Sequence, residues 1–171
     1  MHLAIRFKAL FSPLAQQSPA GFLFVESSFQ GKEERNVELA FGKSGGLLPA
    51  IIQDDVSGDV LMLGFMNAEA FQLTRSTGEV VFFSRSRNRL WKKGESSGHV
   101  LKVREVKVDC DADALLIRVN PLGPGVCHEG YRSCFFRRLD NHGEAEIAAP
   151  RTFSPEAVYG APAAGSKEKK A

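Results

Sequence analysis

Residues 99–108, HVLKVREVKV, follow a period of two, and this pattern constrains the fold more than any other stretch of the chain. With that period, one face would hold Val100, Lys102, Arg104, Val106 and Val108, and the other Leu101, Val103, Glu105 and Lys107. A period of two is typical of a β-strand, whereas a helix repeats every 3.6 residues. The stretch therefore predicts a strand at the centre of the chain.

Several shorter runs also predict strands. Residues 51–52 and 60–65 are apolar and flank the turn residues DDVSGD, which indicates a hairpin. The runs EVVFFSRS, ALLIRV and CFFRRL are further candidates, rich in β-branched or aromatic residues. One helix is predicted between Asn67, a suitable N-cap, and Gly78, where a C-terminal cap is expected. Since short connections favour antiparallel pairing, we expect a mainly β fold of antiparallel sheets, barrel-like or sandwich-like, with one or two short helices.

The two ends of the chain differ from its middle. A chain of 171 residues is expected to hold one folded domain. Residues 1–36 are predicted to be a poorly ordered extension, with a weak organellar transit peptide as the alternative. Residues 141–171 are rich in Ala, Pro and Gly and end in a lysine run, which predicts a disordered tail. The folded domain is therefore expected to span residues 37–140.

Charge and cysteine content exclude several classes of protein. The net charge of +2 is too small to indicate a nucleic-acid partner by itself. No apolar run approaches the roughly 20 residues that a membrane span requires. The three cysteines cannot all pair within one chain, which argues against a disulfide-rich secreted protein. We therefore expect a cytoplasmic protein without a nucleic-acid or membrane partner.

All three cysteines, Cys110, Cys127 and Cys134, lie in the segment DCDADALLIRVNPLGPGVCHEGYRSCFF. Thiolates favour zinc, and three protein ligands with an open fourth position characterise a catalytic zinc site. The spacing C-x16-C-x6-C is not that of a zinc finger. Alternatively, the cysteines are buried structural residues, which suits Cys110 best because it falls within an alternating strand. Spacing alone leaves both interpretations open.

Asp109, Asp111 and Asp113 surround Cys110 at alternate positions. On a strand they would share one face, while Cys110 would point to the other. Carboxylates this close repel one another unless a cation neutralises them, and oxygen ligands suit magnesium. If both metals are bound, Cys110 would not reach the other cysteines of its own chain, and a second subunit would have to complete the zinc site. The alternative is a solvated hairpin turn, where aspartate is common.

Residues 84–100, SRSRNRLWKKGESSGHV, combine five basic residues with the single tryptophan. Arginine and lysine can hold phosphates, tryptophan can stack on a base, and serine hydroxyls can bond a phosphate. The candidate substrate ligands are Arg85, Arg87, Trp91, Lys92, Lys93 and Ser97. The alternative is a basic solvated loop in which Trp91 is a half-buried anchor.

Four blocks, MLGFMNAEAF, FFSRSRNRLWKKGESSG, VDCDADALLIRV and CHEGYRSCFFR, resemble in order and spacing the phosphoribosyl-AMP cyclohydrolases of histidine biosynthesis. The likeness covers residues 47–138, and four blocks in the right order are more specific than any one of them. The resemblance implies a zinc- and magnesium-dependent hydrolase that opens the adenine ring of 1-(5-phosphoribosyl)-AMP between N1 and C6. The product would be the formimino-aminoimidazole carboxamide ribotide intermediate. The resemblance also implies an intertwined homodimer.

The resemblance further implies roles for single residues. The Zn²⁺ ligands would be Cys110, Cys127 and Cys134, with Cys110 supplied by the partner subunit, and the Mg²⁺ ligands would be Asp109, Asp111 and Asp113. Such a zinc centre would supply a hydroxide that attacks C6. His128 directly follows Cys127 and is the candidate proton shuttle.

Two interpretations from other classes remain. A zinc-stabilised nucleic-acid-binding module would use the basic stretch and Trp91, and would need a closed zinc site and salt-dependent binding to a polynucleotide. The count of three cysteines and the acidic residues beside Cys110 argue against it. A dimer without catalytic activity is the weaker alternative.

Overall fold

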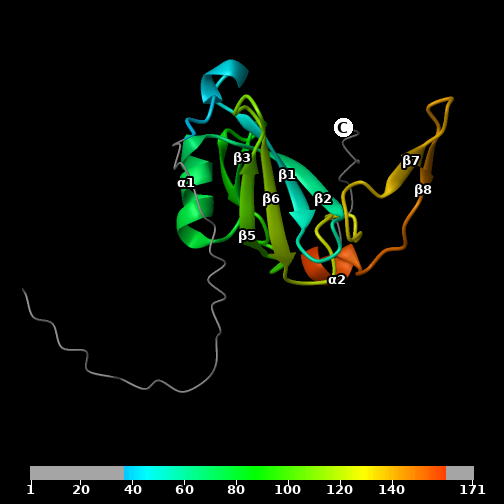
Figure 1. The fold of residues 1–171 in the computed structure, drawn as a ribbon. Coiled ribbons are helices and arrows are strands. Elements are labelled where there is room, and N and C mark those ends of the chain that lie inside the picture. Colours follow the sequence, from blue (N-terminus) through cyan, green and yellow to red (C-terminus); the bar gives the residue numbers. More distant parts are fainter. Residues whose placement is uncertain (1–36, 161–171) are drawn as a thin grey trace, which may run out of the picture. The chain divides into compact units, whose positions relative to one another are not determined.

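A computed structural model describes residues 37–160 (Figure 1). The predicted extension, 1–36, and the last part of the predicted tail, 161–171, lie outside the described residues. Between residues 37 and 160, strands predominate, accompanied by a 3-10 turn η1 (Phe41–Ser44) and the short helices α1 (Ala68–Thr77) and α2 (Pro155–Tyr159). The mainly β class with two short helices is therefore confirmed. None of the helices in this range is long and apolar enough to cross a membrane.

Helix α1 has the predicted caps at both ends. The Asn67 side chain accepts a hydrogen bond from the Ala70 backbone N–H at 2.8 Å. Gly78 ends the helix in the left-handed conformation, with φ of 67°, and its N–H donates to the Thr74 carbonyl. The helix therefore begins and ends where the sequence predicts.

The main sheet has the strand order β2–β1–β6–β5 and contains β1 (Leu48–Asp54), β2 (Val60–Met66), β5 (Leu101–Val108) and β6 (Leu115–Pro121). β1 and β2 form the predicted antiparallel hairpin, and β5 and β6 form another. β1 and β6 run parallel, however, so the prediction of purely antiparallel sheets is wrong. Short connections constrain only strands that are consecutive in the sequence, and these two are not. Within residues 37–160 the sheet does not close into a barrel.

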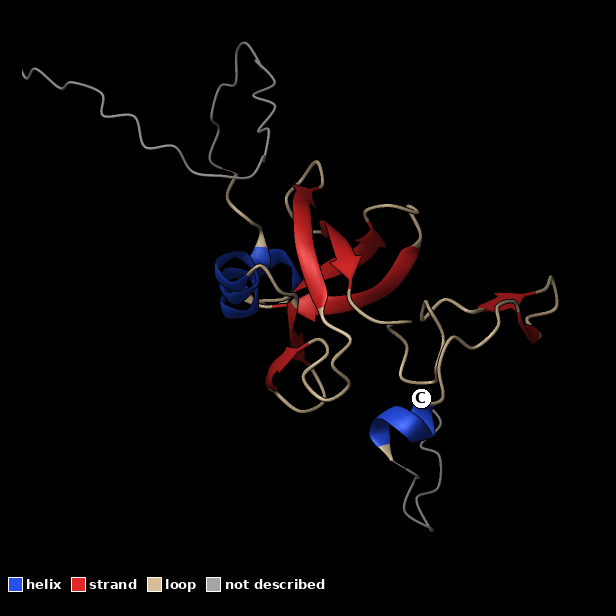
Figure 2. Ribbon diagram, turned by 90° about the horizontal axis from the view of Figure 1, so that it is seen from below, coloured by secondary structure: helices blue, strands red, loops and turns tan. Residues whose placement is uncertain are grey.

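The other strands form two hairpins. β3 (Val81–Ser84) pairs with β4 (Arg89–Lys92), a strand in the segment treated above as a loop. β7 (Arg137–Leu139) pairs with β8 (Ala145–Ile147) and extends away from the main sheet (Figure 2). The strand predicted over CFFRRL is thus limited to its last three residues.

The segment 141–160 also corrects the prediction of a disordered tail, because it holds β8 and α2. Its composition gave no sign of its backbone hydrogen bonds to the rest of the domain. The Ala148 N–H donates to the Phe136 carbonyl at 2.8 Å, and the Thr152 N–H donates to the Gly130 carbonyl at 2.7 Å.

A β-bulge in β5 changes which residues share a face. Pairing with β6 shifts by one residue between Val103 and Glu105. Leu101 and Val103 before the bulge, and Val106 and Val108 after it, all contact the core. The extra residue reverses the alternation, as bulges do. The strand itself was predicted correctly, but the faces assigned beyond Val103 were wrong.

The hydrophobic core also fixes the position of Trp91. The Phe82 ring lies so close to Gly64 that a Cβ at that glycine would be 2.4 Å from a ring carbon. Phe82 in turn stacks on Trp91, with ring centroids 5.4 Å apart. The core thus holds the tryptophan through its neighbour on the paired strand.

Candidate active site

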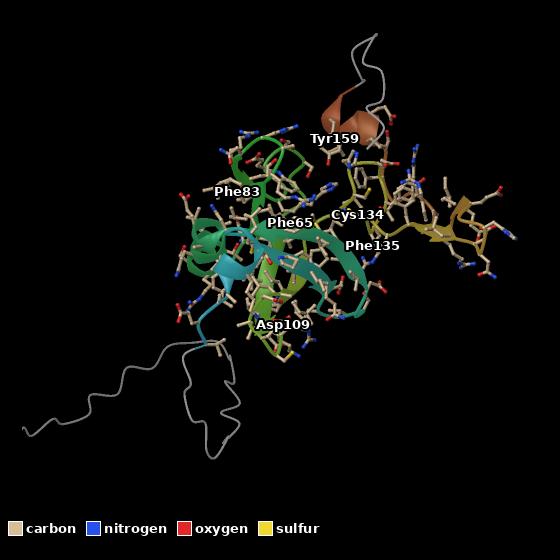
Figure 3. The ribbon with its side chains drawn as sticks, turned by 90° about the horizontal axis from the view of Figure 1, so that it is seen from above. Phe65, Phe83, Asp109, Cys134, Phe135 and Tyr159 are labelled. Atoms are coloured by element: carbon tan, nitrogen blue, oxygen red, sulfur yellow. The ribbon has the colours of Figure 1, made fainter. Side chains whose placement is uncertain are left out.

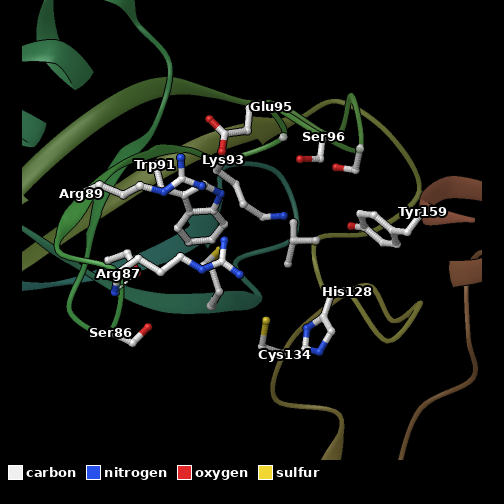
Figure 4. Close-up of a pocket in the computed structure, with 15 residues that line it drawn as sticks. Ser86, Arg87, Arg89, Trp91, Lys93, Glu95, Ser96, His128, Cys134 and Tyr159 are labelled. Carbon is white, nitrogen blue, oxygen red and sulfur yellow. Dashed lines mark hydrogen bonds between the residues drawn. The ribbon is translucent and has the colours of Figure 1, made fainter. Parts of the chain in front are cut away.

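A cavity of about 550 Å³ lies where the β3–β4 hairpin, the loop after β4 and the β6–β7 loop meet (Figure 4). Its volume is in the usual range for small-molecule sites. The lining residues are Met62, Ser84, Ser86, Arg87, Arg89, Trp91, Lys93, Gly94, Glu95, Ser96, Ser97, Val126, His128, Cys134 and Tyr159.

The predicted zinc ligands Cys127 and Cys134 are neighbours in the β6–β7 loop, where the Cys134 thiol is hydrogen-bonded to the Cys127 sulfur. Backbone hydrogen bonds fix both residues: Cys127 N–H donates to the Tyr131 carbonyl at 3.1 Å, and Cys134 N–H donates to the Leu61 carbonyl at 2.8 Å. The second of these bonds ties the loop to β2. The two sulfur atoms are therefore held together at the cavity wall.

This pair carries one negative charge in the metal-free protein. The hydrogen bond from Cys134 is the largest cause that lowers the pKa of Cys127 to about 6, helped by the Glu129 backbone N–H and His128 and opposed by burial. The same hydrogen bond raises the pKa of Cys134. One sulfur is thus a thiolate at neutral pH, and two adjacent sulfur donors are the chemistry that zinc requires.

Three cationic side chains line the same cavity. Lys93 is buried, and Figure 4 shows it directed into the cavity between Trp91 and Tyr159. Burial lowers the pKa of Lys93, while the nearby Cys134 and Cys127 act to raise it. With Arg87 and Arg89, the lysine gives the cavity a positive potential that favours an anionic ligand.

The strand periodicity of β4 decides which predicted substrate ligands reach the cavity. Trp91 and Lys93 lie on one face, and Lys92 lies on the other, where its Nζ contacts Glu79 at 2.8 Å. Arg85 does not line the cavity either, because its guanidinium lies over the Phe65 ring, 3.8 Å from the centroid. Of the predicted substrate ligands and the proton shuttle, the structure brings together Arg87, Trp91, Lys93, Ser97 and His128.

Several cavity residues were not among the predicted substrate ligands. Arg89 was one of the five basic residues considered for phosphate binding, and the alternation of RLWKK, recognised as a strand, would have placed it on the same face as Trp91. Glu95 carries no signal that separates it from an ordinary polar loop residue. Tyr159 lies in a segment whose composition predicted disorder, so no local pattern pointed to it.

The predicted magnesium ligands lie in the β5–β6 turn. Asp109, Asp111 and Asp113 each offer an oxygen within 4.8 Å of the others. The backbone there is a turn rather than a strand: Asp109 Oδ1 accepts hydrogen bonds from the N–H groups of Asp113 and Ala114 at 3.0 and 3.1 Å. The hairpin-turn alternative therefore describes the backbone, and the carboxylates converge nevertheless.

A lysine ammonium already contacts this acidic cluster. Lys43 Nζ lies 2.8 Å from Asp111 Oδ2 and 3.6 Å from Asp113 Oδ2. The hydrogen bond from Lys43 is the largest cause that lowers the pKa of Asp111. Burial, followed by the charge of Asp111, raises the pKa of Asp113. The oxygen atoms thus form a local site of negative charge that attracts a cation.

Cys110 is far from the cysteine pair of its own chain. It lies in the β5–β6 turn and is exposed, whereas Cys127 follows the opposite end of β6. A strand of this length spans about 20 Å. Figure 3 shows the neighbouring Asp109 well separated from Cys134. Within one chain, therefore, only two of the three cysteines are close together.

Comparison with known proteins gives a consistent result. Residues 62–136 match the family model described as Phosphoribosyl-AMP cyclohydrolase. A Solibacter usitatus protein of that name is 60% identical over 124 residues, which cover 72% of this chain and 98% of that protein. A Nitratidesulfovibrio vulgaris protein of the same name is 55% identical over 70% of this chain and 94% of its own length. The chain therefore belongs to the phosphoribosyl-AMP cyclohydrolase family.

Proposed function

We propose that this protein hydrolyses the N1–C6 bond of the adenine ring of 1-(5-phosphoribosyl)-AMP in histidine biosynthesis, in the cytoplasm, where thiols stay reduced. The observation that carries the proposal is that the Cys127–Cys134 pair and three cationic side chains meet at one cavity. Sulfur donors suit the metal that such a hydrolysis needs, and the cations suit a substrate with two phosphates. Family membership supports the same reaction.

Zn²⁺ would be held by Cys127 and Cys134, together with Cys110 of a second copy of the chain. The donor set fits, because two sulfur atoms are within hydrogen-bonding distance and one is a thiolate at neutral pH. When bound, zinc supplies the Lewis acidity that makes water nucleophilic near neutral pH.

The other side chains of the cavity would bind the substrate and transfer a proton. Arg87, Arg89 and Lys93 bind the substrate phosphates. Trp91 packs against a ring of the nucleotide. His128, exposed in the cavity beside the cysteine pair, accepts a proton from the attacking water and returns it to N1 as the C6–N1 bond breaks.

Mg²⁺ would be held by Asp109, Asp111 and Asp113. Lys43 supports this assignment, because its ammonium contacts two of these carboxylates, as a bound cation would. Hard carboxylate oxygens in a solvent-exposed turn also suit a cation that retains part of its water shell.

The proposed zinc site requires a homodimer, because Cys110 does not reach the cysteine pair of its own chain. Mixing two inactive variants tests this. In a mixed dimer of Cys110→Ser and Cys127→Ser chains, one site has lost both residues and the other is intact. Random reassortment should therefore restore about a quarter of the wild-type activity. No recovery from dimers shown to have exchanged subunits would refute a shared site.

The reaction itself is tested by following absorbance during incubation of the purified protein with 1-(5-phosphoribosyl)-AMP and magnesium. Turnover should disappear after treatment with a chelator and return when zinc is added. A folded, zinc-loaded protein without turnover would refute the proposal and favour the nucleic-acid-binding module.

A further inference from the structure

Tyr159 lies in α2 and lines the cavity, although it follows the last residue of the family match, 136. Figure 4 shows its ring on the side of the cavity opposite Trp91. We name residues 148–160, which carry it, the C-terminal arm. The question is whether the arm holds Tyr159 firmly enough for it to contribute to binding.

The arm is seated on the loop that carries the cysteine pair. Thr152 N–H donates to the Gly130 carbonyl at 2.7 Å, and Phe153 N–H donates to the same carbonyl at 3.3 Å. The fit is close, because a Cβ on Gly130 would be 2.5 Å from the Phe153 carbonyl oxygen. The arm therefore cannot shift far without displacing this loop.

A second contact joins the arm to the other wall of the cavity. The Phe153 ring packs edge-to-face on His99, with centroids 4.7 Å apart and planes at 87°. His99 closely follows Ser97, which lines the cavity. Beyond this contact, the Ser154 side chain accepts a hydrogen bond from Ala157 N–H at 3.3 Å and caps α2. The arm thus bridges two walls and presents Tyr159 from a capped helix.

We propose that Tyr159 is a substrate-binding residue whose ring packs against the ring system of the bound nucleotide on the side opposite Trp91. This inference rests on the proposed function. Arg87, Arg89 and Lys93 suit the phosphates, whereas Trp91 and Tyr159 offer the flat apolar surfaces that a nucleobase prefers. Tyr159 is 43% exposed, as expected of a side chain that a ligand would cover.

The test compares Tyr159→Ala and Tyr159→Phe in the full-length, zinc-loaded protein. We expect Tyr159→Ala to raise KM about tenfold while kcat falls less than about threefold, because a stacking contact is made in ground and transition states alike. Tyr159→Phe should keep KM within about twofold of wild type, since it retains the ring. The matched control is Ile147→Ala, which removes a side chain that is 66% exposed and does not line the cavity.

A second measurement uses the single tryptophan. Trp91 lines the cavity, so AMP binding can be followed by the change in its fluorescence. Tyr159→Ala should weaken AMP binding about tenfold, and Phe153→Ala should weaken it by less, because it only loosens the arm. If Tyr159→Ala does not fold, Tyr159→Leu provides the same test, since it keeps apolar bulk without a flat face.

Unchanged KM and AMP affinity in Tyr159→Ala, with an active wild type, would overturn the inference. A Tyr159→Phe variant as impaired as Tyr159→Ala would show that the hydroxyl makes the contact and would overturn stacking. A wild type that neither turns over nor binds AMP would instead refute the proposed function.

Discussion

The cysteine pair and the acidic cluster lie at opposite ends of β6 and balance their charge in different ways. In the pair, the Cys134 thiol proton is hydrogen-bonded to the Cys127 thiolate. In the cluster, the ammonium of Lys43 lies against two carboxylates. The pair is fixed by backbone hydrogen bonds at a cavity, whereas the cluster lies in a turn with Asp109 and Asp111 exposed. Metal binding would therefore displace a proton at one end and a side chain at the other.

Cys134→Ser should have the largest effect. We expect kcat/KM to fall on the order of a thousandfold or more and zinc to be lost, because a hydroxyl is a poor replacement for a thiolate ligand. Elemental analysis of the dialysed protein and the activity assay measure both quantities. A variant that retains stoichiometric zinc would show that Cys134 is not a ligand.

Asp111→Asn should weaken the use of magnesium without removing a zinc ligand. The magnesium concentration for half-maximal activity should rise about tenfold to a hundredfold, because a charged oxygen ligand is lost. Zinc content should stay at the wild-type level, because the three proposed zinc ligands Cys110, Cys127 and Cys134 are all retained. Loss of zinc from this variant would show that Asp111 is also needed to position its neighbour Cys110.

Lys43→Met should act in the opposite direction. Removing an ammonium from the cluster should make Mg²⁺ bind about fivefold more tightly, a modest change because the charge is solvent-exposed and screened. Isothermal titration calorimetry measures the affinity. Lys107→Met is the matched control, because Lys107 pairs with Glu105, 3.5 Å away and outside the cluster. Equal effects of both substitutions would indicate only a change in net charge.

The carboxylate of Glu79 is paired with two lysine side chains, so its charge is balanced without a metal ion. The ammonium groups of Lys102 and Lys92 lie 2.5 and 2.8 Å from the Glu79 carboxylate oxygens. The hydrogen bond from Lys102, followed by that from Lys92, lowers the pKa of Glu79 from 4.5 to about 2. Because the folded-state pKa is depressed, the stability that Glu79 adds is complete above about pH 4.5 and is lost as the pH falls toward 2. Glu79→Gln should therefore lower Tm by a few degrees at pH 7. The difference should shrink at pH 3.

Thermal unfolding of wild type and Glu79→Gln at several pH values checks this, with added salt as the control for screening. A Tm difference that remains constant down to pH 2 would mean that Glu79 acts by packing rather than by charge.

Local patterns predicted the features that depend on local chemistry. The caps of α1 at Asn67 and Gly78, and the β1–β2 hairpin, follow from residue types at fixed spacing. The convergence of the aspartates also follows, because neighbours in a short turn cannot lie far apart. The proximity of Cys127 and Cys134 was left open by the spacing and was implied by the resemblance, since six intervening residues allow many loop conformations.

Features that depend on distant contacts were not predictable. The parallel pairing of β1 with β6 joins strands separated by 60 residues of the chain. Tyr159 is held at the cavity by the contacts of the arm with Gly130 and His99, and these leave no trace in the residues around Tyr159. Arg85 was misplaced for the same reason, because its guanidinium lies over the ring of Phe65, which is distant in the sequence. Lys92 was misplaced for a local reason, because β4 was treated as a loop.

The bulge in β5 has a consequence for protein engineering. Deleting Arg104 would leave Leu101, Val103, Val106 and Val108 in strict alternation, so the sequence around the bulge is that of a regular strand with one inserted residue. A shortened chain would therefore keep its buried face and the same β6 partners on both sides of the deletion, because the offset in register disappears with the deleted residue. The inserted residue adds a local bend to β5 without changing the pairing that positions the acidic turn, so this turn should tolerate its removal.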